Sequence, residues 1–220
     1  MRPSKQAILQ TIHSSGLVPL FYTGDVNVAK QVLDVSYQGG ARVFEFANRG
    51  AGALEAFKEL VEHCASWSDF YIGAGTIMNA VDGRKFTDAG AQFLISPIFK
   101  HEIAEFALNE DMLWLPGCAT LTEIITATDA GAELVKIFPG SVLGPGFVSS
   151  VMPVVPSLKI MPTGGVEPTV DNLKAWFKAG VYCVGMNTHL FPTEQIQSGN
   201  WSAIEQRVRE ALRIISTVRK

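Results

Sequence analysis

Eight apolar stretches of strand length recur along this chain of 220 residues, and each is followed by a segment with helical periodicity. The stretches are almost continuously apolar, which is typical of parallel strands that are covered on both faces. The predicted strands are residues 18–23, 42–47, 70–76, 92–97, 112–117, 133–140, 158–165 and 181–187. A chain with this alternation is expected to build a parallel sheet surrounded by helices.

The segments between the predicted strands carry apolar residues at helical spacing and mostly stop before a glycine. They predict helices over residues 26–38, 52–65, 79–89, 100–109, 120–130, 146–152 and 169–179, a leading helix over 3–15 and a closing amphipathic helix around 204–215. Asp25 is a predicted N-cap, and Thr120 with Glu123 a predicted capping box. Eight strand–helix units predict an α/β fold, a (β/α)8 or TIM barrel with an N-terminal helix, as one domain over residues 1–220.

A doubly wound open sheet is the alternative architecture. It commonly binds a dinucleotide through a G-x-G-x-x-G turn after a strand. The chain has no such motif after a predicted strand, since the run from Gly73 to Thr76 is too short for it. The barrel is therefore favoured.

Composition limits the expected partners. The net charge of −3 gives no reason to expect nucleic acid or an anionic membrane as a partner. Three scattered cysteines, Cys64, Cys118 and Cys183, have no metal-ligand spacing and indicate a reducing compartment without disulfides. The first residues include no long apolar run, so we expect no signal peptide and a cytoplasmic protein.

One lysine stands inside the apolar sixth strand, ELVKIFPG at residues 133–140. In a strand, Leu134, Lys136 and Phe138 share one face. Burial of an ammonium ion is costly, so an amine in this position tends to be neutral and nucleophilic. The alternative is a lysine that reaches solvent or pairs with a carboxylate.

Other polar residues stand at the ends of the predicted strands, where the active site of such a barrel lies. Glu45 and Arg49 flank the end of the second strand, Thr76 ends the third, and Thr163-Gly164-Gly165 ends the seventh. Together with Lys136 they supply an amine, a carboxylate, a guanidinium and backbone amides. This set suits attack on a keto acid, in which the amine forms an iminium and the carboxylate moves protons.

The sequence also resembles a known family over about residues 7–215. The motifs that carry the resemblance are VFEFANR with Glu45 and Arg49, GAGT at 73–76, AGAQFLISP at 89–97, LPG at 115–117, VKIFP at 135–139 and PTGGV at 162–166. They resemble the aldolases of 2-keto-3-deoxy-6-phosphogluconate (KDPG) and 4-hydroxy-2-oxoglutarate (KHG), which are class I, Schiff-base enzymes. The resemblance implies a (β/α)8 barrel assembled as a homotrimer, a keto-acid substrate, and neither a cofactor nor a metal.

The resemblance also implies roles for individual residues. Lys136 matches the Schiff-base lysine and Glu45 the general acid/base. Arg49 and Thr76 match contacts to the pyruvate carboxylate, and Gly164 and Gly165 match part of a phosphate site. The remaining predicted substrate contacts are Pro97, Phe138, Thr163, Asn187 and Thr188.

One segment departs from the family pattern. After the eighth strand the family usually has a turn of Gly and Ser that helps to hold phosphate, whereas this chain has Asn187 and Thr188. Phosphate recognition is therefore open, and a galactonate epimer, KHG or an unphosphorylated sugar acid are alternative substrates. A non-catalytic, ligand-binding barrel and a metal-dependent lyase are further alternatives. The first is disfavoured by the retained lysine, glutamate and arginine, and the second by the lack of clustered metal ligands.

Overall fold

Parallel strands form a curled sheet in two parts. The computed structural model describes residues 2–219, and its strands are ordered β5-β4-β3-β2-β1-β9 in one part and β6-β7-β8 in the other. The strands are β1 Leu17–Phe21, β2 Val43–Ala47, β3 Tyr71–Gly75, β4 Phe93–Ile95, β5 Leu113–Leu115, β6 Gly117–Cys118, β7 Val135–Ile137, β8 Ile160–Pro162 and β9 Val184–Met186. Their order follows the chain without the reversal of a doubly wound sheet, so that alternative is wrong.

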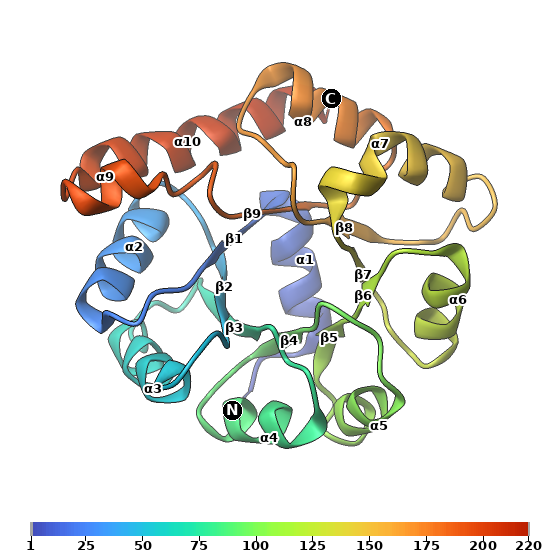
Figure 1. Cartoon of the computed structure of the whole chain (residues 1–220), viewed down its shortest axis with the longest axis horizontal. Helices are drawn as coiled ribbons and strands as arrows, with labels where there is room; N and C mark the ends of the chain where they lie inside the picture. Colours follow the sequence, from blue (N-terminus) through green and yellow to red (C-terminus); the bar gives the residue numbers. More distant parts are fainter. Residues whose placement is uncertain (1, 220) are drawn as a thin grey trace.

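The two parts of the sheet adjoin at both sides. β5 and β6 are separated by Pro116, whose missing N–H interrupts the ladder of hydrogen bonds. The predicted fifth strand is therefore two short strands. On the other side, Thr163 beyond β8 forms a parallel bridge with Gly185 in β9. Figure 1 shows the strands curled around a common centre within a ring of helices.

The helices follow the predicted alternation with two differences. They are α1 Lys5–Ser15, α2 Val26–Gln38, α3 Ala53–His63, α4 Ala80–Asp88, α5 His101–Asn109, α6 Leu121–Asp129, α7 Gly140–Val151, α8 Val170–Lys178, α9 Thr193–Gln197 and α10 Trp201–Val218. The Asp25 cap and the Thr120–Glu123 capping box are both present. However, α7 begins six residues earlier than predicted and is interrupted at Gly144, where φ is 68°. The short α9 was not predicted.

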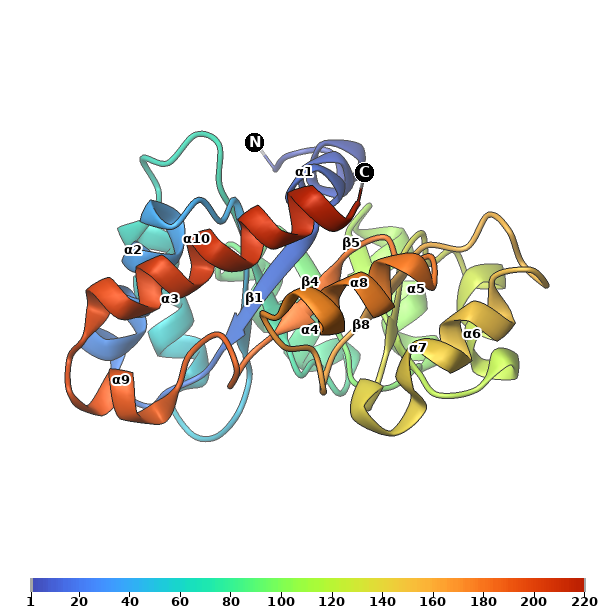
Figure 2. The ribbon, with the colours of Figure 1, turned by 90° about the horizontal axis from the view of Figure 1, so that it is seen from above.

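Alternate residues of the strands build two layers of core. Residues such as Phe44, Leu94 and Val135 face the surrounding helices. Their neighbours point inward and form a second cluster with α1. Besides α1, its members come from the strands or from the position just before one: Val18, Val43, Phe93, Ile95, Leu113, Leu115, Leu134, Met161 and Cys183. The leading helix contributes Ile8, Leu9 and Ile12 to this cluster, so α1 covers one end of the strands. Figure 2 shows α1 at that end, and α9 with the start of α7 at the other.

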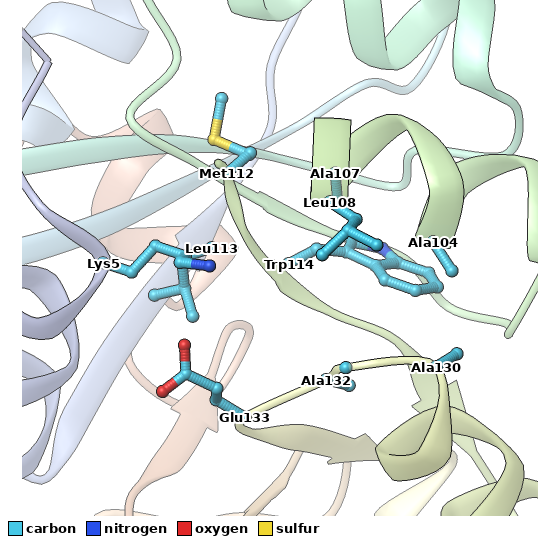
Figure 3. A pocket seen from close by; sticks show the side chains of 11 residues that line it. Lys5, Ala104, Ala107, Leu108, Met112, Leu113, Trp114, Ala130, Ala132 and Glu133 are labelled. Atoms are coloured by element: carbon cyan, nitrogen blue, oxygen red, sulfur yellow. The ribbon is translucent and has the colours of Figure 1, made fainter. Parts of the chain in front are cut away.

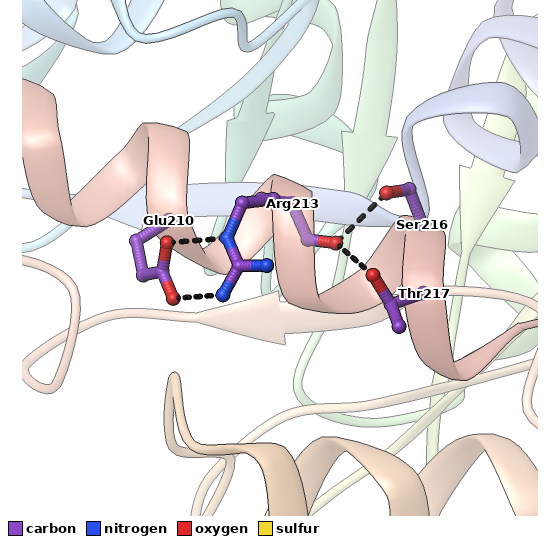
Figure 4. A network of polar contacts seen from close by, with 4 residues as sticks. All are labelled: Glu210, Arg213, Ser216 and Thr217. Carbon is purple, nitrogen blue, oxygen red and sulfur yellow. Dashed lines mark hydrogen bonds and ion pairs between the residues drawn. The ribbon is translucent and has the colours of Figure 1, made fainter.

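The last helix is amphipathic, as its sequence predicts. Its buried face is Ile204, Val208, Ala211, Ile214 and Ile215. Its solvent face carries charged pairs such as Glu210 with Arg213, which are joined by two hydrogen bonds of 2.7 Å (Figure 4). One turn later, the hydroxyls of Ser216 and Thr217 donate to the Arg213 carbonyl. Within residues 2–219, no helix combines the length and the apolar character needed to cross a membrane.

Candidate active site

Lys136 lies in the middle of β7 and is 4% exposed. Its strand neighbours are Gly117 in β6 and Met161 in β8. Leu134, two residues earlier, belongs to the inner cluster, so the alternation of a strand directs the Lys136 side chain inward as well. The expectation that this lysine is buried in a strand agrees with the structure, and the alternative in which it reaches solvent is wrong.

Glu45 in β2 is the charged partner of this lysine. Lys136 Nζ lies 3.5 Å from Glu45 Oε1, and the two side chains are 5% and 1% exposed. The second oxygen, Glu45 Oε2, accepts no hydrogen bond from any group of residues 2–219. A buried polar atom without a partner costs roughly 1–3 kcal/mol, and buried ion pairs add little to stability. The pair is thus poorly explained as a stabilising contact.

Glycines leave room for these polar side chains. A Cβ atom at Gly75 in β3 would lie 2.6 Å from Glu45 Cδ and closer still to Oε1. A Cβ atom at Gly185 in β9 would overlap Thr163 Oγ1. Real Cβ atoms do not approach other atoms so closely, so any side chain at Gly75 would displace the carboxylate of Glu45. Neither glycine carries a signal of this role in the sequence.

Thr163 and the two following glycines leave β8 beside Lys136. The Thr163 side chain is 3% exposed, and its Oγ1 has no hydrogen-bond partner in the described chain. Its backbone N–H donates to Ile137 O at 3.0 Å, which ties the turn to the strand of the lysine. Gly164 and Gly165 have φ values of 91° and 69°, a backbone conformation that favours glycine.

The other predicted site residues lie around the same end of the strands, on the loops that follow them. Phe138 follows β7 and is 37% exposed, with its ring centroid 5.6 Å from Lys136 Nζ. Thr76 follows β3 with a positive φ of 58°, and Pro97 follows β4 half-buried. Arg49 and Thr188 are exposed, and Asn187 is half-buried. Glu45 and Phe138 thus lie close to Lys136, and the other predicted residues belong to the loops that follow the strands at the same end.

The three cysteines, which lie in the described part of the chain, do not form a competing nucleophilic site. Burial raises the pKa of the Cys64 thiol to about 11 and, together with Glu123, that of Cys118 to about 12. Burial also raises the pKa of Cys183, so these thiols are poor nucleophiles at neutral pH. Among residues 2–219, no group of three or more His, Cys, Asp or Glu is placed to hold a metal ion.

A small cavity lies away from this site, between α1, α5 and the loop before β7. It is lined by Lys5, Leu113, Trp114 and Glu133 among others (Figure 3). Its volume of about 20 Å³ has room for about one water molecule. It is therefore too small to hold a keto acid.

Comparison with known proteins identifies relatives over most of the chain. The model of the family "KDPG and KHG aldolase" matches residues 8–207. A 2-dehydro-3-deoxy-phosphogluconate aldolase of Pseudomonas aeruginosa is 33% identical over 181 residues, 81% of this chain and 80% of that protein. The 2-dehydro-3-deoxy-6-phosphogalactonate aldolase of Escherichia coli K12 is 32% identical over 150 residues, 68% of this chain and 69% of that protein.

A solved structure shares both the fold and the sequence similarity. It is the KDPG aldolase of Legionella pneumophila, determined with pyruvate captured as a covalent carbinolamine intermediate. It superimposes with a TM-score of 0.84 at 25% identity, over 92% of this chain and 97% of that chain.

Proposed function

This chain belongs to the KDPG and KHG aldolase family, and we propose that it cleaves a 2-keto-3-deoxy-6-phospho sugar acid or 4-hydroxy-2-oxoglutarate into pyruvate and an aldehyde. The observation that carries the proposal is the buried pair of Lys136 in β7 and Glu45 in β2, with Nζ and Oε1 3.5 Å apart in the interior of the curled sheet. A relative's covalent carbinolamine with pyruvate supports the same chemistry. Lys136 is the proposed Schiff-base nucleophile, and Glu45 the proposed acid and base.

The reaction begins with attack of the Lys136 amine on the C2 ketone of the substrate. The resulting carbinolamine loses water, with a proton from Glu45, and becomes an iminium ion. Glu45, acting through a water molecule, then takes the proton of the C4 hydroxyl. The electrons of the C3–C4 bond move into the iminium, which releases the aldehyde and leaves an enamine. Protonation at C3 and hydrolysis of the imine return pyruvate and the free lysine.

The predicted residues around Lys136 and Glu45 are proposed to orient the two ends of the substrate. Arg49 and Thr76 bind the carboxylate beside C2, because a guanidinium and a hydroxyl donate to carboxylate oxygens. Phe138 and Pro97 enclose the pyruvyl part. At the other end, Thr163, Gly164 and Gly165, with Asn187 and Thr188, contact the part of the substrate that becomes the aldehyde.

Alternatives differ from this proposal in measurable ways. A galactonate-type or unphosphorylated acid would use the same lysine. A non-catalytic barrel would leave unexplained a buried amine and carboxylate whose Oε2 has no partner among the described residues. A metal-dependent lyase would need a cluster of ligands for its ion, whereas the iminium of the proposed reaction is itself the electron sink.

The proposal extends to the architecture and the assembly. We propose that β5 and β6 count as one strand, which gives a closed eight-stranded barrel in one domain over residues 1–220. The bridge from Thr163 to Gly185 supports closure on the opposite side. Family membership supports a homotrimer and a cytoplasmic, keto-acid enzyme without nucleic-acid or membrane partners.

A retro-aldol panel tests the proposed function. The purified protein is incubated in EDTA with KDPG, its galactonate epimer, their unphosphorylated counterparts and KHG, and pyruvate release is followed. We expect pyruvate from at least one of these acids, and the same rate without EDTA. No release from any acid would refute the proposal, and a loss of activity in EDTA that a divalent cation restores would favour a metal-dependent lyase.

A further inference from the structure

The turn that joins β8 to α8 is held from two sides. It consists of residues 163–167, and its two glycines have left-handed backbone angles. The side chain of Val166 is 2% exposed and anchors the turn in the core. Because glycines are conformationally free in an unfolded or loose loop, a defined direction of their N–H groups requires contacts on both flanks.

On one flank, the turn packs against the start of α7. Gly140 N–H donates to Thr163 O at 2.8 Å. A Cβ atom at Gly140 would lie 2.6 Å from Gly164 O, and one at Gly165 would lie 2.7 Å from Ser141 Cα. The two backbones touch there without intervening side chains, so the turn cannot shift toward α7.

On the other flank, a single side chain forms two hydrogen bonds with the backbone of the turn. Asn172, half-buried in the first turn of α8, donates from Nδ2 to Gly165 O at 3.1 Å. Its Oδ1 accepts from Glu167 N at 3.0 Å. The backbone of Asn172 is fixed in turn by the N-cap Thr169, whose hydroxyl accepts from Asn172 N at 3.4 Å.

We infer that Asn172 is a positioning residue that holds the Gly164–Gly165 turn in the shape required to bind the distal phosphate of the substrate. The inference rests on the proposed function and adds to it a residue that lies outside the set of substrate contacts. Asn172 bonds the far side of the turn, at Gly165 O and Glu167 N. The N–H groups of the glycines are thereby left to the substrate.

Asparagine suits this position for a chemical reason. Its amide carries one acceptor oxygen and a donor NH2 group, so it bonds a carbonyl and an N–H at once. Aspartate has the same shape but only acceptor oxygens, so Asn172→Asp keeps the bond from Glu167 N and places an oxygen against Gly165 O. Alanine removes both bonds. The two variants therefore weaken the turn by different routes.

The test compares two acids that differ only in the phosphate. Wild type, Asn172→Asp and Asn172→Ala are assayed with a 2-keto-3-deoxy-6-phospho sugar acid and with its unphosphorylated counterpart. Asn200→Ala is the matched control, since the Asn200 side chain caps α10 by accepting from Ala203 N, a bond within α10 and not to residues 163–167. Borohydride trapping of pyruvate on each variant measures the lysine chemistry without a distal group, and thermal unfolding measures stability.

We expect both Asn172 variants to raise KM for the phosphorylated acid roughly tenfold, the effect of one to two lost hydrogen bonds. Three quantities should stay within about twofold of wild type in both variants. They are kcat with the phosphorylated acid, KM for the unphosphorylated acid and the yield of pyruvate trapping. The Asn200→Ala control should match wild type in all of these measurements. Equal losses with both acids, unchanged KM despite lower thermal stability, or a wild type that does not distinguish the two acids would overturn the inference. A wild type that releases no pyruvate from any acid of the panel, KHG included, and traps no pyruvate would instead refute the proposed function.

Discussion

The two ends of the strands differ in whether buried polar side chains lie in their interior. At the end covered by α1, the interior is filled by apolar side chains such as Val43, Phe93 and Leu134 packed on Ile8 and Ile12. At the other end, named the open end, the interior holds Glu45, Lys136 and Thr163, all less than 5% exposed. Glu45 Oε2 and Thr163 Oγ1 have no hydrogen-bond partner in the described chain.

This difference separates the part of the fold that stabilises from the part that we propose takes part in the reaction. An apolar interior contributes free energy of folding through burial, whereas a buried polar atom without a partner subtracts from it. Such atoms persist where function requires them. We therefore expect substitutions at the covered end to change stability alone, and substitutions at the open end to change activity first.

The largest expected effect is that of Glu45→Gln at the open end. The amide keeps the size of the carboxylate but cannot accept a proton, and loss of general acid–base catalysis costs roughly 10²–10⁴-fold in rate. The kcat of the retro-aldol reaction should fall by this order, while the pyruvate adduct still forms slowly. Glu59→Gln, an exposed glutamate paired with Lys30, is the control. Turnover close to wild type in Glu45→Gln would rule out the assigned role.

Ile12→Ala at the covered end should affect only stability. Ile12 is fully buried, and removal of such a side chain costs about 2–5 kcal/mol through lost burial and a cavity. Denaturant unfolding should show this loss, while kcat/KM at a temperature well below unfolding stays unchanged. Gln10→Ala, on the exposed face of α1, should leave both quantities unaltered. If Ile12→Ala lowered kcat in the folded enzyme, the two ends would be coupled and the separation would be wrong.

The turn after β9 provides a smaller, substrate-specific test. Asn187 O accepts from Leu190 N at 2.8 Å and Phe191 N at 2.9 Å, so the backbone holds this turn without the side chain. If the Asn187 side chain narrows the phosphate pocket, Asn187→Gly should raise kcat/KM for the phosphorylated acid. One gained hydrogen bond to a charged group is worth roughly 1.5–3 kcal/mol, or about 10–100-fold. An equal response of the unphosphorylated acid, or a strong wild-type preference for phosphate, would remove the significance of this residue.

Thr163→Val is expected to have the smallest effect in free energy. It should change stability and activity in opposite directions. Valine removes the buried hydroxyl that lacks a partner, so the free energy of unfolding should rise by about 1 kcal/mol. The kcat/KM should fall, because the substrate can no longer form a hydrogen bond with the Thr163 hydroxyl. Denaturant unfolding and the pyruvate assay measure the two. A variant that is less stable and fully active would contradict the view that polar groups at the open end are kept for function.

Much of the fold follows from local patterns in the sequence. Apolar runs predict the strands, and glycines such as Gly16 and Gly90 predict where helices stop. The break at Pro116 was missed because apolar residues on both sides read as one strand. The early start of α7 was missed because a helix beginning with Gly140 and interrupted at Gly144 lacks the usual periodicity. The five residues of α9 are too few to produce a helical pattern.

The residues of the candidate site could be predicted from the sequence, whereas the distances between them could not. A lysine in an apolar strand and polar residues at strand ends identify Lys136 and Glu45, but their separation depends on how far the sheet curls. Gly75 and Gly185 were missed because the need for a missing side chain depends on contacts with other strands. Asn172 was missed because at the start of a helix it reads as an ordinary capping residue. Its spacing of seven residues from Gly165 gives no signal of contact.

The central claim is that Lys136 is the nucleophile, and covalent trapping tests it most directly. The protein is incubated with pyruvate and borohydride, digested and analysed by mass spectrometry, beside Lys136→Arg and a sample without pyruvate. Lys136 is buried beside Glu45 at the open end, so we predict one reduced pyruvyl group, on the peptide that contains Lys136, and none in either control. No adduct on the wild type, or an adduct on a different lysine, would contradict the account.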